Sequence, residues 1–263
     1  MDQLLDPMFR IPLYTGLVAS LLLPLLGALL HAREEWLAAL GIAHVTAAAQ
    51  LAGAALGLPL MASGALGAVT AVAAKQAVNR QGNLGYALLM FAGWAVLYLV
   101  AANSSLGESL AHAMSEGQIF LVGKEQLVVL LAAGLPFLIG LHWLSHRLLR
   151  ARFFPGFEEV NALPGWRWHL AFDLLAALLL AFGTASLGLM ASFALVVLPG
   201  WAVFVWVSSW RAALVAATGL GVISYLAAFA LALKFDQPFA PVQVAVLLVL
   251  AAGLRMAHAV TGR

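Results

Sequence analysis

The strongest constraint in this sequence is an apolar stretch that carries no Asp, Glu, Lys or Arg from Trp36 to Ala74. Similar runs recur along the 263 residues, of which 64% are hydrophobic and only 9% charged, with a mean hydropathy of +1.00. A water-soluble fold cannot bury so much apolar surface, and the runs are long enough for helices to cross a bilayer. We therefore expect an all-α, polytopic helical membrane protein with about eight to nine transmembrane helices in a single domain, residues 1–263.

Composition and motifs exclude several other classes of protein. The chain has no cysteine, so it has neither a disulfide frame nor a thiolate metal site, and no basic block indicates nucleic acid. Two acidic residues precede the first basic residue, Arg10, which is not the pattern of a secretory signal peptide. The closest approach to a phosphate-binding loop, Gly117 to Gly123-Lys124, has five intervening residues and is followed by Glu125. The chain is thus expected not to be an enzyme and not to hydrolyse ATP itself.

Nine apolar segments are expected as membrane helices, and the third or the seventh is a candidate re-entrant segment. They cover Ile11–Leu30, Trp36–Leu58, Leu60–Ala74, Leu84–Ala102, Glu125–Leu149, His169–Phe182, Leu189–Val207, Ala212–Leu233 and Val242–Met256. Between them we expect a polar loop at Lys75–Asn83, a loop with a short interfacial helix at Asn103–Lys124, and a short turn at Gly183–Gly188.

The basic residues are unevenly distributed between the two sets of loops. With nine crossings, Arg33, Lys75, the Arg147–Arg152 cluster, Arg211 and the C-terminal arginines all fall on one side. Loops rich in Lys and Arg remain in the cytoplasm. The C-terminus is therefore expected to be cytoplasmic.

His44 is the one histidine within the uncharged stretch. At about 1.5 Å of rise per residue it lies roughly 12 Å inside the helix that starts at Trp36. An ionisable group at that depth is costly and usually faces a protein interior or a water-filled pathway. Two interpretations remain open at this point: a residue of a transport pathway, or a packing histidine bonded to a neighbouring helix.

Two other polar positions have competing interpretations. His142 and His146 lie one helical turn apart, as a metal pair would, but Trp143 stands where a zinc protease has its catalytic Glu. The pair adjoins Arg147, which favours a polar helix terminus. Asp173, about one turn into its segment, is expected to pair with Arg167 or to face a cytoplasmic cavity.

The cytoplasmic loop at about residues 153–165 has a composition suited to docking. A short amphipathic helix between prolines is expected there, with Phe157 and Val160 on one side at i, i+3. The alternative is a plain loop. The candidate docking residues are Phe157, Glu158, Glu159, Val160, Asn161 and Ala162.

Four motifs in order resemble the membrane permease of the zinc/manganese/iron ABC importer family, over about Leu13 to Met256. In that family a basic turn leads into G-D-x-L-x-H-A; here Arg33 leads into AALGIAHV, with His44 at the motif histidine. The later matches are Gly117-Gln118-Ile119, Leu187-Gly188-Leu189-Met190 through Pro199-Gly200, and the turn Phe235-Asp236-Gln237-Pro238-Phe239-Ala240-Pro241.

The resemblance implies an importer of Zn²⁺ or Mn²⁺, or of iron, in the bacterial cytoplasmic (inner) membrane. It implies a homodimer in membrane lipid, two cytoplasmic ABC ATPase subunits that bind ATP and grip Phe157–Ala162, and a periplasmic or surface-anchored metal-binding protein. It implies no permanently bound cofactor. Transport would proceed by ATP-driven alternating access, with His44 as a transient ligand.

The sequence departs from the family pattern at Leu40, where the family has the motif aspartate. An Asp–His pair at i, i+4 would supply two metal ligands on one helix face, and here only His44 remains. Two alternatives therefore stay open: the same fold with another cargo, such as a metal chelate, and an ion-coupled secondary transporter.

Overall fold

The computed structural model describes residues 7–78, 82–104, 117 and 119–262, and the regular elements in these ranges are all helical. The α-helices are α1 (Arg10–Ala32), α2 (Trp36–Ala55), α3 (Leu60–Val78), α4 (Asn83–Ala102), α6 (Lys124–Phe153), α7 (Phe157–Val160), α8 (Gly165–Leu187), α9 (Leu189–Val203), α10 (Trp210–Phe235) and α11 (Phe239–Thr261). Short 3₁₀ turns, η2 (Pro7–Phe9) and η4 (Ile119–Leu121), precede α1 and α6. The expected all-α fold class is confirmed.

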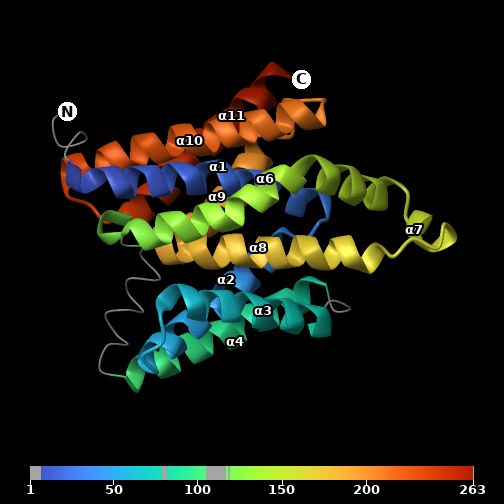
Figure 1. The fold of residues 1–263 in the computed structure, drawn as a ribbon. Helices are drawn as coiled ribbons and strands as arrows, with labels where there is room; N and C mark the ends of the chain where they lie inside the picture. Colours follow the sequence, from blue (N-terminus) through green and yellow to red (C-terminus); the bar gives the residue numbers. More distant parts are fainter. Residues whose placement is uncertain (1–6, 79–81, 105–116, 118, 263) are drawn as a thin grey trace.

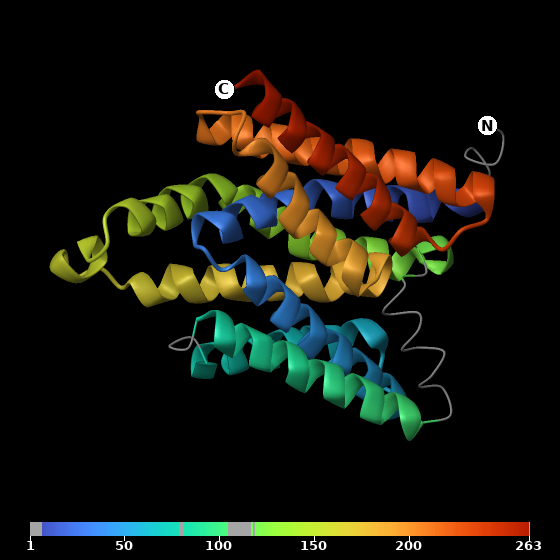
Figure 2. The same ribbon diagram turned by 180° about the vertical axis from the view of Figure 1, so that it is seen from behind.

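Seven helices in the described ranges are long and apolar enough to cross a membrane: α1, α2, α4, α6, α8, α10 and α11. The two segments singled out as weak are both helical, α3 with 19 residues and α9 with 15. The helices lie roughly along one axis, and α7 projects from one end of the bundle, here called the α7 end (Figure 1). α1 begins at the opposite end, whereas α11 finishes at the α7 end (Figure 2).

Two expected connections differ from the structure. The turn expected at Gly183–Gly188 is wrong, because α8 continues to Leu187 and only Gly188 turns the chain, with φ +86°. The loop expected to begin at Lys75 is also wrong at that residue, which lies inside α3. Most of the interfacial helix expected at Asn103–Lys124 falls on residues 105–116 and 118, which lie outside the described residues.

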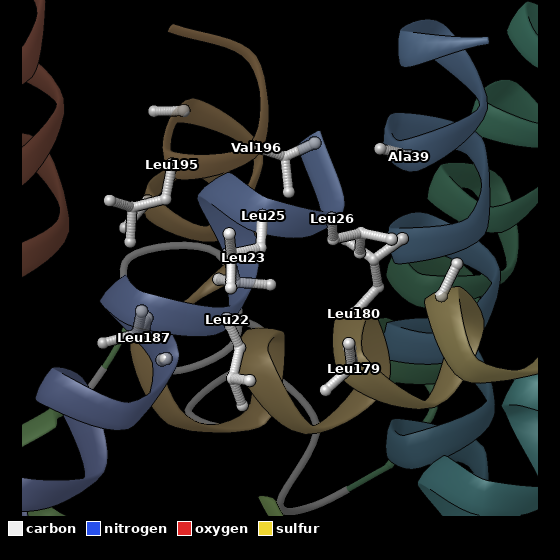
Figure 3. Close-up of a cluster of buried hydrophobic side chains, with 14 of the residues drawn as sticks. Leu22, Leu23, Leu25, Leu26, Ala39, Leu179, Leu180, Leu187, Leu195 and Val196 are labelled. Atoms are coloured by element: carbon white, nitrogen blue, oxygen red, sulfur yellow. The ribbon is translucent and has the colours of Figure 1, made fainter. Parts of the chain in front are cut away.

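The core forms around α1, which packs against α6, α8, α9 and α10. Leu22, Leu23 and Leu26 of α1 are fully buried, and Figure 3 shows them beside leucines of α8 and α9. α1 and α9 also approach closely at Gly27, where a Cβ would lie 1.8 Å from the Val196 carbonyl oxygen. Within lipid, such small residues let helices gain van der Waals contact.

A second group of helices, α2, α3 and α4, also packs through close approach at glycines. A Cβ on Gly93 of α4 would lie 2.6 Å from the backbone of His44, and a Cβ on Gly41 of α2 would lie 2.8 Å from the Tyr86 carbonyl oxygen. α2 also contacts α8. His44 is therefore held on a helix that is covered by neighbours on several sides.

Candidate functional site

Four charged side chains that are far apart in the sequence meet at the α7 end of the bundle, and we call them the ion cluster: Arg33, Glu35, Lys75 and Asp173. Lys75 Nζ donates to Asp173 Oδ1 at 2.5 Å and to Glu35 Oε2 at 2.9 Å. Arg33 donates to the same Asp173 oxygen at 3.0 Å, and it forms an ion pair with Glu35 at 2.8 Å. The cluster joins the α1–α2 turn, α3 and α8.

The ion cluster is buried, and its charges balance. The side chains of Lys75 and Asp173 are only 2% and 3% exposed. The two cations and two anions of the cluster sum to a formal charge of zero. Gln76 donates a further hydrogen bond to Asp173 Oδ2 at 3.2 Å. A buried pair of this kind holds its geometry well but becomes costly once one partner is removed.

The structure corrects the expectation for Asp173. Its partners are Arg33 and Lys75 rather than Arg167. It does line a polar cavity of about 540 Å³ together with Arg33, Glu35 and His169. The sequence did not indicate that Lys75 pairs with Glu35 and Asp173. A lysine at the end of an apolar run has the same local pattern as the first residue of a loop, and Lys75 was expected to begin one.

Glu35 lies in the turn between α1 and α2. Burial alone raises the pKa of this carboxyl, but the positive charges of Arg33 and Lys75 and their hydrogen bonds outweigh it, so the pKa lies below its ordinary value. Glu35 is therefore held ionised, as the balance of the ion cluster requires.

The short helix expected at about residues 153–165 is present as α7, one turn of helix that starts after Gly156 in the left-handed conformation (φ +84°). Two of its residues are turned toward the bundle. The Trp168 indole donates to Glu158 at 2.5 Å, and the Arg150 guanidinium lies 4.5 Å from the centre of the Phe157 ring. Phe157 and Val160 do not act as one face, because Val160 points outward and is 85% exposed.

The six candidate docking residues thus divide into two sets. Phe157 and Glu158 hold α7 to α6 and α8, whereas Glu159, Val160, Asn161 and Ala162 are exposed beyond the end of the bundle. This gives α7 an outward surface and a fixed inward attachment.

His44 is 5% exposed and lies in α2, two turns from the α7 end of that helix. Its Nδ1 lies 2.8 Å from the Leu40 carbonyl oxygen, which can only accept, so the proton belongs on Nδ1. In the neutral ring Nε2 then carries the lone pair, and it makes no hydrogen bond to any residue within the described ranges. The bonded partner is its own helix, not a neighbouring one.

Neither His44 nor the His142–His146 pair belongs to a group of three potential ligands among the described residues. In the described part of the chain, no three His, Asp or Glu side chains are grouped so that they could hold a metal ion. The His142 and His146 rings are 4.5 Å apart and are both exposed. The described residues therefore offer single imidazoles or one pair, and a metal at His44 or at this pair would need further ligands.

The helical bundle with its projecting α7 defines a polytopic membrane protein, and comparisons with known proteins identify the family. A profile of the ABC 3 transport family matches residues 6–257, so the chain belongs to that family. A search of curated proteins found no match.

Two solved structures have the same fold. The PsaBC complex from Streptococcus pneumoniae with a bound Fab aligns with a TM-score of 0.82 and 14% identity, over 97% of this chain and 92% of that chain. A transporter described as of the metal-chelate ABC type, in an inward-facing conformation, aligns with a TM-score of 0.78 and 16% identity, over 99% of this chain and 88% of that chain. The chain is thus a permease of an ABC transport system.

Proposed function

We propose that this chain is the permease of an ABC importer that carries a divalent metal ion, Zn²⁺ or Mn²⁺, across a bacterial inner membrane. The observation that carries the proposal is α7, a helix anchored by Phe157 and Glu158 that offers four exposed residues to a partner. The partners would be two cytoplasmic ATPase subunits that bind ATP, a second copy of the permease, and an external metal-binding protein.

The route of coupling follows from the contacts of α7. When the ATPase subunits close, a displacement of α7 reaches α8 through Glu158 and Trp168, and α6 through Phe157 and Arg150. Asp173 then links α8 to α3 and to the turn that starts α2. α2 carries His44, so one chain of contacts joins the ATPase surface to the candidate pathway residue.

His44 is suited to be a transient ligand for the transported ion. Its free Nε2 lone pair is an imidazole donor of the kind that Zn²⁺ and Mn²⁺ accept, and the bond from Nδ1 to Leu40 orients the ring. Because Leu40 replaces the family's aspartate, the remaining ligands would come from the partner protomer, from water or from the cargo. Such a loosely held ion is easily released, which suits transport.

A metal chelate is the second candidate cargo. A chelated ion brings most of its own ligands, so one imidazole per chain is enough to recognise it. This alternative is favoured by the absence, within the described ranges, of any three-residue group able to hold a bare ion. The fold shared with a metal-chelate type transporter is compatible with it.

The test is to express the permease with its neighbouring ATPase and to purify the complex through a tag on the permease. ATP hydrolysis in proteoliposomes is expected to rise when Zn²⁺ or Mn²⁺ and the binding protein are added. Stimulation only by a metal–chelator complex would support the second candidate. A permease that retains no ATPase, and transports under a proton gradient alone, would overturn both and favour a secondary transporter.

A further inference from the structure

A second cavity, of about 540 Å³, separates α6 from α10 near the α7 end. We call it the α6–α10 cavity. Its polar lining includes Ser145, His146, Trp210 and Arg211, and leucines such as Leu138 and Leu214 provide an apolar side. Its lining includes neither a residue of the ion cluster nor His44, and none of the proposed transport steps uses it.

Several polar groups of this cavity have no partner. Ser145 is 6% exposed, and its Oγ makes no hydrogen bond to any described residue. The buried Trp210 Nε1 is likewise unpaired within the described ranges. Arg211 at the rim of the cavity is exposed and forms no ion pair in the part of the chain that the structure describes. Buried polar atoms such as Ser145 Oγ and Trp210 Nε1 are normally satisfied, so their meeting at one cavity, beside the exposed cation of Arg211, indicates a missing partner.

The charge of the lining selects an anion. Arg211 is a cation, Trp210 can only donate, and both belong to the first turn of the 26-residue helix α10, whose dipole also favours negative charge. A metal ion is disfavoured, because the guanidinium repels it and His142 and His146 supply only two nitrogens. A phosphate group matches both the charge and the number of donors.

The apolar side shows what else the ligand must carry. Leu138 lies about two turns from Ser145 along α6, and Leu214 lies one turn beyond Arg211 along α10, both away from the α7 end. The cavity therefore has polar groups at the start of α10, where Trp210 and Arg211 lie, and leucines that extend from there toward the middle of the bundle. A free phosphate would leave the leucines uncovered.

We propose that the α6–α10 cavity binds one phospholipid of the surrounding membrane, with its phosphate at Arg211, Trp210 and Ser145 and an acyl chain along Leu138 and Leu214. α6 and α10 make little direct contact, so the lipid fills the space between them. α6 leads into α7, and a lipid at this position braces the helix that carries the docking segment. The inference depends on the place of the chain in a bilayer and not on its cargo.

The experiment is native mass spectrometry of the full-length purified permease with added phosphatidylglycerol as the probe. Arg211→Gln is expected to weaken binding of the tightest lipid about tenfold, as the loss of one charge-assisted hydrogen bond would. Trp210→Phe keeps the aromatic contact with Phe204 and is expected to weaken it less. Both positions are at the surface or half-buried, so the fold, checked by thermal unfolding, should be kept.

Arg255→Gln is the matched control, because Arg255 is also an arginine near the α7 end but lies over the Trp201 ring, 4.7 Å from its centre. It should bind the lipid as the unaltered chain does. Equal binding of diacylglycerol, which lacks the phosphate, would overturn the proposal, as would an Arg211→Gln variant that binds normally. Displacement of the lipid by inorganic phosphate would show that the anion is a soluble one and would overturn the lipid as its source.

Discussion

The ion cluster makes a prediction about stability that is independent of transport. Asp173→Asn keeps the size of the side chain and removes one negative charge from a site whose four charges sum to zero. Arg33 and Lys75 are then left with Glu35 alone, and Lys75 is only 2% exposed. The variant therefore contains two cations and one anion, so one positive charge of the buried cluster is not balanced.

The size of the effect follows from that uncompensated charge. Removing one partner of a buried ion pair costs about 3–5 kcal/mol. For a chain of this length each kcal/mol lowers the melting temperature by about 2–4 °C, so Asp173→Asn should melt roughly 6–20 °C below the unaltered chain. Because the same charge balance is restored by removing a cation, the double variant Lys75→Met with Asp173→Asn should recover much of the loss.

The assay is tryptophan fluorescence during thermal unfolding in detergent, with the two single variants and the double variant measured together. A coupling free energy of about 2 kcal/mol or more between Lys75 and Asp173 is expected. If the stability losses of the two single variants add up in the double variant, or if Asp173→Asn melts at the same temperature as the unaltered chain, the reasoning from charge balance is refuted.

Three further predictions concern packing, pH and docking. Gly93→Ala places a Cβ 2.6 Å from the backbone of His44, so it should destabilise the chain by about 1–3 kcal/mol in thermal unfolding. Gly253→Ala in α11, whose Cβ meets nothing within 4 Å, should not destabilise it, because alanine is the better helix former. The pKa of the Glu35 carboxyl is below its ordinary value of 4.5, so the stability that Glu35 contributes is complete above about pH 4.5 and is lost as the pH falls through the folded pKa. A Glu35→Gln variant should therefore show a weaker dependence of melting temperature on pH in acid. An equal dependence would contradict this. Glu158→Ala removes the acceptor of the Trp168 indole N–H, so amide hydrogen exchange in α7 should become faster. The free energy of unfolding should fall by about 1 kcal/mol or less. Unchanged exchange would show that this contact does not hold α7.

The sequence alone was sufficient to locate the long helices, because each is a long apolar run bounded by polar residues. It was misleading at Gly183, where a glycine in an apolar run suggested a turn. In the structure a Cβ there would lie 3.3 Å from Leu23, so tertiary packing, which has no local signature, holds the glycine within α8.

The site was predictable only where its residues are neighbours in the sequence. The candidate docking segment from Phe157 to Ala162 is one continuous stretch, and the short helix in it, α7, was expected from the sequence. The bond between Lys75 and Asp173 joins residues 98 positions apart, and nothing near either residue indicates the other. For His44, depth was predictable from the helix start at Trp36, whereas the bond to the Leu40 carbonyl depends on the rotamer of the ring.

The most direct test of the transport proposal is ATP-driven metal accumulation in proteoliposomes that contain the permease, its ATPase and the binding protein. The unaltered complex should accumulate Zn²⁺ or Mn²⁺ only with ATP, and His44→Ala should reduce the rate about tenfold or more without loss of the dimer. His31→Ala is the matched control, since that ring makes the same bond to its own helix, at the Gly27 carbonyl, and should transport normally. Equal accumulation by the His44→Ala complex, or accumulation without ATP, would contradict the account.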